Sequence, residues 1–149
     1  MVIHGPNLNM LGKKEPDIYG TTTLEIINNL LLEKATNENI ELIIKQSNHE
    51  GEIINWIQQY SLFVEGIIIN PAAFIHYSTA IRDALANLSI PVIEVHLSNI
   101  YARESLRHYS IISPIAQGLV SGFGSKSYLL ALDAIIHLVK NDDNLPSHS

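Results

Sequence analysis

The sequence predicts an α/β fold in which a parallel sheet lies between two layers of helices. Two observations lead to this prediction. Short runs rich in β-branched residues alternate with segments whose apolar residues recur at helical spacing, which is typical of parallel strands joined by crossover helices. One of these runs, Ile67 to Ile69, is apolar at consecutive positions, as expected for a strand covered on both faces.

Five segments are predicted as strands: residues 2–3, 40–44, 66–69, 91–95 and 118–120. Four helices are predicted from apolar stripes within residues 24–35, 53–60, 81–88 and 129–139. Thr23 is a candidate cap for the first helix, and the turn Gly122–Gly124 precedes the last one. This arrangement predicts a flavodoxin-like three-layer α/β/α sandwich with a five-stranded parallel sheet in the order 2-1-3-4-5.

The chain has 149 residues and no Cys. A chain of this length buries roughly 70% of its unfolded surface, so residues 1–140 are predicted to form a single α/β domain. Residues 141–149 are polar and aperiodic and are expected to form a disordered tail. The lack of Cys excludes disulfides, thiolate metal sites and thiol nucleophiles.

Nine Lys and Arg against fifteen Asp and Glu give a net charge of −6, which argues against nucleic acid or an anionic membrane as a partner. No apolar run approaches the roughly 20 residues of a membrane-spanning helix. Residues 1–6 show no basic segment followed by an apolar stretch, as a signal peptide would. We therefore expect a soluble, cytoplasmic protein.

Polar residues follow the first four predicted strands. They lie in the segments 5–9, 46–50, 70–76 and 94–99. Ligands of open α/β sheets bind beyond the carboxyl ends of the strands, so these segments predict a site at one edge of the sheet.

The sharpest local feature is Glu94-Val95-His96. Residues i and i+2 of a strand point to the same face, so Glu94 can orient the imidazole of His96 and favour its protonated form, as a general acid requires. The alternative interpretation is a buried ion pair that closes the end of a core strand, and the tripeptide alone favours that alternative.

Tyr19 lies in a polar connection that is too long for a tight turn. Lys13 and Lys14 are close to it in sequence, and a nearby cation would lower the pKa of a phenol by ~1–3 units, which would make Tyr19 a base. The alternative is a surface Tyr that packs the loop.

Other candidates also have structural interpretations. Asn70 suits a turn, and His76 is placed to cap the next helix. Asp83 fits a solvated helix face. Arg103 and Arg107 would share a face if that stretch is helical, which would give an anion clamp; the alternatives are a surface pair, or pairing with Glu104 or a neighbouring subunit.

Two further patterns were weighed for ligand binding. The Gly118, Gly122 and Gly124 cluster lacks the ending of a phosphate loop and is interpreted as a tight turn. None of the seven His shows His-x-His or His-Glu-x-x-His spacing, so no metal site is predicted.

Taken together, the motifs resemble the type II 3-dehydroquinases (3-dehydroquinate dehydratases). The resemblance covers most of the chain, from Val2 to about Val139, and is specific because several blocks occur in the right order. These blocks are Gly5–Gly12, Glu15-Pro16 with Tyr19-Gly20, Gln46–Asn48, Asn70–Phe74 with His76 and Ser78, Arg82–Ala84, Ile93–Asn99, Ala102–Glu104 and Arg107-His108.

The resemblance implies the dehydration of 3-dehydroquinate to 3-dehydroshikimate in the shikimate pathway, without a cofactor or metal. It implies that Tyr19 removes the C2 proton and that His96, oriented by Glu94, protonates the departing C1 hydroxyl. Asn7 would hold a water that stabilises the enolate. The family usually has Arg at the position of Lys14, in a lid over the site, where it lowers the tyrosine pKa.

The resemblance also implies a set of substrate-binding residues and an assembly. The family assembles as a homododecamer, a tetramer of trimers, and Asp83 would reach the site of a neighbouring subunit. The other residues implied to bind the hydroxyls and carboxylate of the substrate are Asn70, His76, Arg107 and the backbone amides of Leu97 and Ser98.

The sequence also departs from the family pattern. Lys14 keeps the charge of Arg but loses its planar fork of donors, and Ile75 stands where Thr or Ser is usual. Ser105 and Tyr109 replace the commoner Glu and His. The first strand starts several residues later than the family pattern, which leaves a truncated or misassigned start at Met1 as an alternative.

Two alternative functions therefore stay open. Lys14 and Ile75 would fit a catalytically weakened dehydroquinase-like protein that binds without turnover. A flavin-binding or receiver module suits the fold class alone. This sequence lacks the Ser/Thr-rich first loop of the flavin-binding proteins, and it has Asn70 where a receiver would need Asp.

Overall fold

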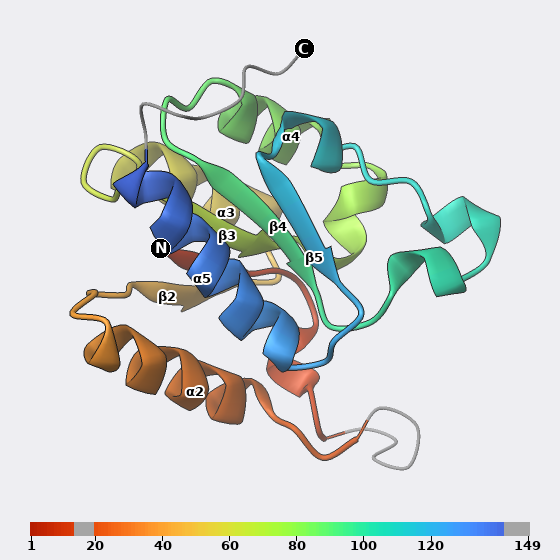
Figure 1. The fold of residues 1–149 in the computed structure, drawn as a ribbon. Coiled ribbons are helices and arrows are strands. Elements are labelled where there is room, and N and C mark those ends of the chain that lie inside the picture. The colour runs from red at the N-terminus through yellow and green to blue at the C-terminus, as the bar shows by residue number, and fades with distance from the viewer. Residues whose placement is uncertain (14–19, 142–149) are drawn as a thin grey trace.

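The computed structural model of the protein describes residues 1–13 and 20–141. Five parallel strands form one sheet in the order β2-β1-β3-β4-β5, which confirms the predicted topology (Figure 1). The strands are β1 (Val2–His4), β2 (Ile44–Gln46), β3 (Ile67–Asn70), β4 (Val92–His96) and β5 (Gly118–Ser121).

Helices cover both faces of this sheet, as predicted for a three-layer sandwich (Figure 1). Within the described ranges, each helix is too short or too polar to cross a bilayer. The helices are α2 (Leu24–Asn37), α3 (Glu50–Tyr60), α4 (Thr79–Ala86) and α5 (Lys126–Lys140), and the short 3₁₀ turns are η1 (Leu8–Met10), η2 (Ala72–His76), η3 (Ile100–Ala102), η4 (Ser105–Arg107) and η5 (Ser113–Ile115).

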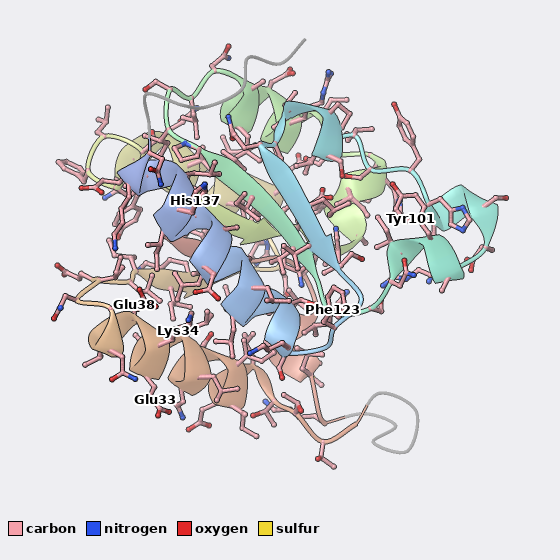
Figure 2. The ribbon with its side chains drawn as sticks, in the orientation of Figure 1. Glu33, Lys34, Glu38, Tyr101, Phe123 and His137 are labelled. Atoms are coloured by element: carbon pink, nitrogen blue, oxygen red, sulfur yellow. The ribbon has the colours of Figure 1, made fainter. Side chains whose placement is uncertain are left out.

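The two faces of the sheet belong to two separate hydrophobic clusters. Side chains of alternate strand residues point to opposite faces, so Ile3 and Ile69 pack with α3 and α4, whereas Val2 and Ile68 pack with α2 and α5. On the second face Lys34 of α2 lies 2.8 Å from Asp133 of α5 and joins the two helices at their surface (Figure 2).

Two helices begin at hydroxyl caps. The Thr23 side chain accepts a hydrogen bond from the Ile26 N–H, which confirms Thr23 as the cap of α2. The cap of α4 is Ser78, whose hydroxyl accepts from the Ile81 N–H at 3.1 Å. The interpretation of His76 as this cap is therefore wrong, and its imidazole makes a different contact, described below.

The second strand differs from the prediction. Residues 40–44 were predicted, but β2 spans Ile44–Gln46, because β1 begins at Val2 and Val2 pairs with Ile44. The Ile43 carbonyl still accepts from the Val2 N–H at 2.8 Å, but residues 40–42 have no described strand beside them, and Ile40 and Leu42 pack against the core instead. The apolar pattern of residues 40–44 thus reports burial, whereas pairing decides where the strand lies.

Gly5, directly after β1, lies where the backbones that follow the first and third strands come close together. Its N–H donates to the Asn70 carbonyl at 2.7 Å, and a Cβ there would lie 2.7 Å from the backbone carbon and oxygen of Pro71. Gly5→Ala is expected to lower the free energy of unfolding by about 2 kcal/mol, measured by urea denaturation.

Gly51→Ala in α3 is the matched control, because a Cβ there meets open space. It should stabilise the protein by about 0.5 kcal/mol through helix propensity. Equal stabilities of the two variants would contradict the close approach at Gly5.

Candidate active site

The polar residues that the sequence places after the strands meet at the carboxyl edge of the sheet. In the ladder, His4 pairs with both Gln46 and Asn70, and His96 pairs with Ser121. Each of the five strands therefore ends in a polar residue, and the parallel register brings these five residues to one edge.

The candidate residues divide between the two faces at this edge. Glu94 and His96 alternate with Ile93 and Val95, so they lie on the face covered by α3 and α4. Asn70 lies on the opposite face, where it contacts α5. The candidate site therefore spans the end of the sheet and combines two separately built halves.

Glu94 and His96 form a buried pair. Their side chains are 0% and 5% exposed, and Nε2 of His96 lies 3.3 Å from Oε2 of Glu94. Among the described residues, this Nε2 has no hydrogen bond of good geometry, so the contact with Glu94 is a close approach of the two groups rather than an aligned hydrogen bond. Glu94 thus provides a negative charge directly beside the imidazole.

Two serines anchor the Glu94 carboxylate. The Ser110 hydroxyl accepts from the N–H groups of Ile112 and Ser113 at 3.2 and 3.1 Å, so its proton is directed to Oε1 of Glu94 at 2.6 Å. The Ser113 hydroxyl donates to Oε2 at 2.5 Å. Burial opposes ionisation of Glu94, but the neighbouring His96 ring and the hydrogen bonds from Ser110 and Ser113 outweigh it and lower the carboxyl pKa below its ordinary value.

The segment that carries Ser110 and Ser113 also contacts His76. Nδ1 of His76 lies 3.1 Å from the Tyr109 carbonyl oxygen. A carbonyl oxygen only accepts, so Nδ1 carries a proton, and in the neutral ring Nε2 is left as an acceptor. Ile75, the departure from the family pattern, is 1% exposed and packs in the core, while its carbonyl accepts from the Ile111 N–H.

Asn70 is held at both ends of its amide. Oδ1 accepts from the Ala72 N–H at 3.1 Å, and Nδ2 donates to the Tyr128 hydroxyl at 2.9 Å. Ala72 has a φ of 50°, in the left-handed region that is unfavourable for Ala by roughly 1–2 kcal/mol. The turn that follows β3 thus keeps a strained backbone in the geometry that Asn70 requires.

Asn7 lies at the tip of the loop after β1. It is exposed, has a φ of 68° that Asn tolerates better than most residues, and its N–H donates to Oδ1 of Asn48 at 2.9 Å. Gln46 donates to the Gly5 carbonyl and to Asn48, so the segment after β2 braces this loop.

Leu97 and Ser98 follow β4 and are fixed by their neighbours. The Leu97 carbonyl accepts from the Gly124 N–H at 2.8 Å, and the Ser98 carbonyl accepts from the Ser121 hydroxyl at 2.8 Å. Gly122 and Gly124 have positive φ values of 103° and 59°, as the predicted tight turn requires.

The two arginines do not share a helix, so the condition for a common helical face is not met. Residues 100–107 form two separate 3₁₀ turns, and Arg103 lies between them. Nε of Arg107 lies 2.9 Å from Oε1 of Glu104, and both side chains are more than half exposed, as in the alternative weighed above. Figure 2 shows Tyr101 on the same outlying segment.

Three predicted residues remain: Asp83, Lys14 and Tyr19. Asp83 is exposed on α4. Lys14 and Tyr19 lie outside the described residues, so their catalytic roles stay predictions.

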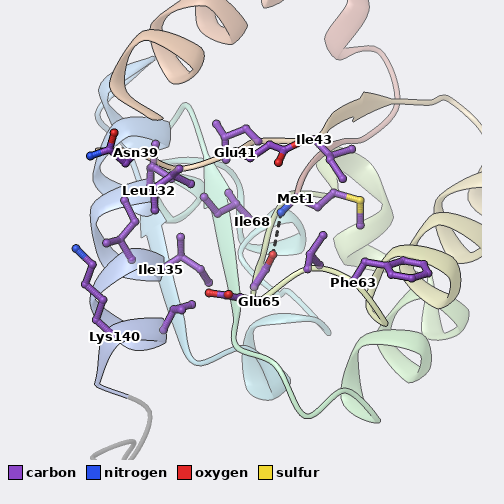
Figure 3. A pocket seen from close by; sticks show the side chains of 16 residues that line it. Met1, Asn39, Glu41, Ile43, Phe63, Glu65, Ile68, Leu132, Ile135 and Lys140 are labelled. Atoms are coloured by element: carbon purple, nitrogen blue, oxygen red, sulfur yellow. Dashed lines mark hydrogen bonds between the residues drawn. The ribbon is translucent and has the colours of Figure 1, made fainter. Parts of the chain in front are cut away.

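A cavity of about 540 Å³ lies at the other end of the sheet (Figure 3). Apolar side chains such as Ile68, Leu132 and Ile135 form much of its lining. The Met1 amino group donates to the Gly66 carbonyl at 2.9 Å, and burial lowers its pKa to about 6. Of the predicted catalytic residues that the structure describes, none belongs to this lining.

Sequence analysis missed three residues that contact the candidate residues: Ser110 and Ser113 donate to Glu94, and Tyr128 accepts from Asn70. Tyr128 falls among the apolar residues of α5, so its periodicity indicates only a core position. The serines are more than a dozen residues from Glu94, and neither their type nor their spacing indicates a contact with it.

Ser113→Ala tests the anchoring of Glu94. Because the folded-state pKa of Glu94 lies below 4.5, its ionised form stabilises the fold above about pH 4.5, and this contribution is lost as the pH falls through the folded-state value. The variant is expected to lose about 2 kcal/mol of unfolding free energy at pH 7 and less near pH 3.5. Denaturant unfolding at both pH values measures the difference.

Ser61→Ala serves as the control, because that hydroxyl makes one long exposed bond to the Gln58 carbonyl. It should change stability little at either pH. A loss in Ser113→Ala that does not depend on pH would contradict the charge-assisted bond.

Comparison with known proteins gives the family. The model of Dehydroquinase class II matches residues 1–136. The 3-dehydroquinate dehydratase of Dictyoglomus turgidum is 58% identical over 135 residues, which cover 91% of this chain and 93% of that protein. The 3-dehydroquinate dehydratase of Trichodesmium erythraeum is 53% identical over 141 residues, covering 95% and 94%.

A solved structure agrees with these matches. The type II dehydroquinase from Butyrivibrio crossotus superposes with a TM-score of 0.87 at 48% identity and covers 91% of this chain and 94% of that one. With its sheet order, polar strand ends and matching sequence over most of its length, this chain belongs to the class II dehydroquinase family.

Proposed function

We propose that this chain is a 3-dehydroquinate dehydratase that converts 3-dehydroquinate to 3-dehydroshikimate in the shikimate pathway. The observation that carries the proposal is the buried Glu94–His96 pair at the carboxyl edge of the sheet in a chain of this family. A carboxylate beside an imidazole in a water-poor site favours the protonated ring, which is the form that a general acid needs.

The reaction needs a base and an acid. The C2 proton is acidic because it is adjacent to the C3 carbonyl. Tyr19, as the phenolate, removes this proton and leaves an enolate. His96 then protonates the C1 hydroxyl, which departs as water, and the double bond forms between C1 and C2. Asn7 holds the water that hydrogen-bonds to the enolate oxygen. A properly placed acid or base contributes ~10²–10⁴-fold to such a rate.

Substrate hydroxyls meet acceptors and donors that are already oriented. His76 offers Nε2 as an acceptor because Nδ1 is held by the Tyr109 carbonyl, and Asn70 retains one N–H and one lone pair of its amide. Arg107 binds the substrate carboxylate, which takes the place of the Glu104 carboxylate at the guanidinium. The Leu97 and Ser98 amides complete this anion site.

The chemistry is complete with side chains and water, so no cofactor or metal is included in the proposal. Asp83 is exposed on α4 and available to a neighbouring subunit, consistent with assembly as a homododecamer, a tetramer of trimers. The protein acts in the cytoplasm, with 3-dehydroquinate rather than nucleic acid or a membrane as its partner.

A steady-state assay with 3-dehydroquinate tests the function, following the absorbance of the conjugated enone product. The unmodified chain should turn over and keep its activity after borohydride treatment, because no Schiff base forms. Tyr19→Phe should lower kcat at least about 10²-fold, since the base is lost while the ring remains.

Tyr60→Phe is the control for Tyr19→Phe and should keep full activity, because Tyr60 lies on α3 near Lys45 and away from the candidate residues. A folded chain without any turnover would refute the proposed function, and full activity in Tyr19→Phe would refute the assigned base.

Lys14→Arg tests the lid substitution separately. Arg presents several donors in a planar fork where Lys presents one point charge, so the variant is expected to raise kcat by about tenfold. The same assay measures it, with Lys13→Arg as the neighbouring control. An unchanged kcat would show that the ammonium group already serves this reaction.

A further inference from the structure

A chain of hydrogen bonds lies behind Asn70, on the face of the sheet opposite Glu94 and His96. It joins four elements: β3 through Asn70, α5 through Tyr128, β1 through His4 and α2 through Asn28. Nδ2 of Asn70 lies 2.9 Å from the Tyr128 hydroxyl, which lies 3.0 Å from Nδ1 of His4, and Nε2 of His4 lies 2.8 Å from Oδ1 of Asn28.

The direction of every bond in this chain can be determined. Oδ1 of Asn28 can only accept, so Nε2 of His4 carries a proton and donates it. Burial lowers the pKa of His4 to about 4, so at neutral pH the ring has one proton and Nδ1 is an acceptor. The Tyr128 hydroxyl therefore donates to His4, and its oxygen accepts from Asn70.

This directed chain determines which end of the Asn70 amide faces which way. A flipped amide would place Oδ1 against the Tyr128 oxygen, whose proton is already given to His4, and Nδ2 against the Ala72 N–H. Both contacts would then be repulsive or unpaired in a buried place, where an unsatisfied polar group costs about 1–3 kcal/mol.

We infer that Tyr128 and His4 are positioning residues for substrate binding, because they fix the Asn70 amide with one N–H and one lone pair free at the carboxyl edge. The inference rests on the proposed function, in which Asn70 binds a substrate hydroxyl. Neither residue is a catalytic residue. The Tyr128 ring is fully buried in the cluster between the sheet and α2 and α5, beside the His4 ring at 5.2 Å.

Tyr128→Phe removes the phenol oxygen and keeps the buried ring. We expect KM for 3-dehydroquinate to rise about tenfold and kcat to change less than threefold, because Glu94 and His96 lie on the other face. The pH profile of kcat should keep its shape. A variant that was only less stable would instead lose kcat in proportion to the unfolded fraction, with KM unchanged.

His4 provides a second pair of variants. His4→Leu removes the acceptor of the Tyr128 proton and should raise KM as Tyr128→Phe does. His4→Asn places Oδ1 near the position of Nδ1, so it keeps an acceptor for Tyr128 and should restore KM to within about threefold of the unmodified chain. Tyr60→Phe, which removes a phenol oxygen on the other face, should leave KM unchanged.

NMR of the Asn70 side-chain amide gives a readout that is independent of turnover. Its protons should exchange slowly in the unmodified chain and in His4→Asn, and at least tenfold faster in Tyr128→Phe and His4→Leu. Unchanged exchange, or freed exchange with unchanged KM, would overturn the inference while leaving the dehydratase activity intact. Lack of turnover in the unmodified chain would instead refute the proposed function.

Discussion

The buried charge of Glu94 is the constraint on which much of the site depends. A carboxylate with no exposed surface is stable only where polar partners surround it. Ser110 and Ser113 donate hydrogen bonds to Glu94, and the His96 imidazole lies beside it. For Ser110 and Ser113 to reach Glu94, the chain that follows the turns η3 and η4 must come back to β4. On this return it also meets His76 and Ile75, so one requirement orders both histidines of the candidate site.

On the other face the constraint is a matter of hydrogen-bond direction rather than charge. Tyr128 and His4 are buried, and burial raises the pKa of the Tyr128 phenol and lowers that of His4, so both side chains stay neutral. Neutral partners can be satisfied only in one donor order. The Asn70 amide at the end of these hydrogen bonds therefore has a fixed orientation.

Much of this fold could be predicted because the strands are short, apolar and regularly separated by helices. The sheet order and the cap at Thr23 follow from alternation and local chemistry alone. The second strand was misplaced because an apolar pattern measures burial, whereas residues 40–42 have no described strand beside them. The 3₁₀ turns around Arg103 were not predictable from charge spacing, since spacing gives a shared face only if the chain is helical.

Contacts between residues close together in the sequence could be predicted, whereas contacts made through tertiary structure could not. Glu94 and His96 share a strand, so their contact follows from a two-residue period. Ser110, Ser113 and Tyr128 reach their partners through tertiary structure, and nothing in their immediate sequence distinguishes them from loop and core residues.

The separation of the two halves by the sheet has an evolutionary consequence. The side chains behind Glu94 and those behind Asn70 lie on opposite faces and belong to different packing clusters. Substitutions in one half should thus have effects that add to those in the other, with little coupling free energy between them. A substitution in one half can therefore be compensated by a second substitution in the same half, without changes on the other face of the sheet.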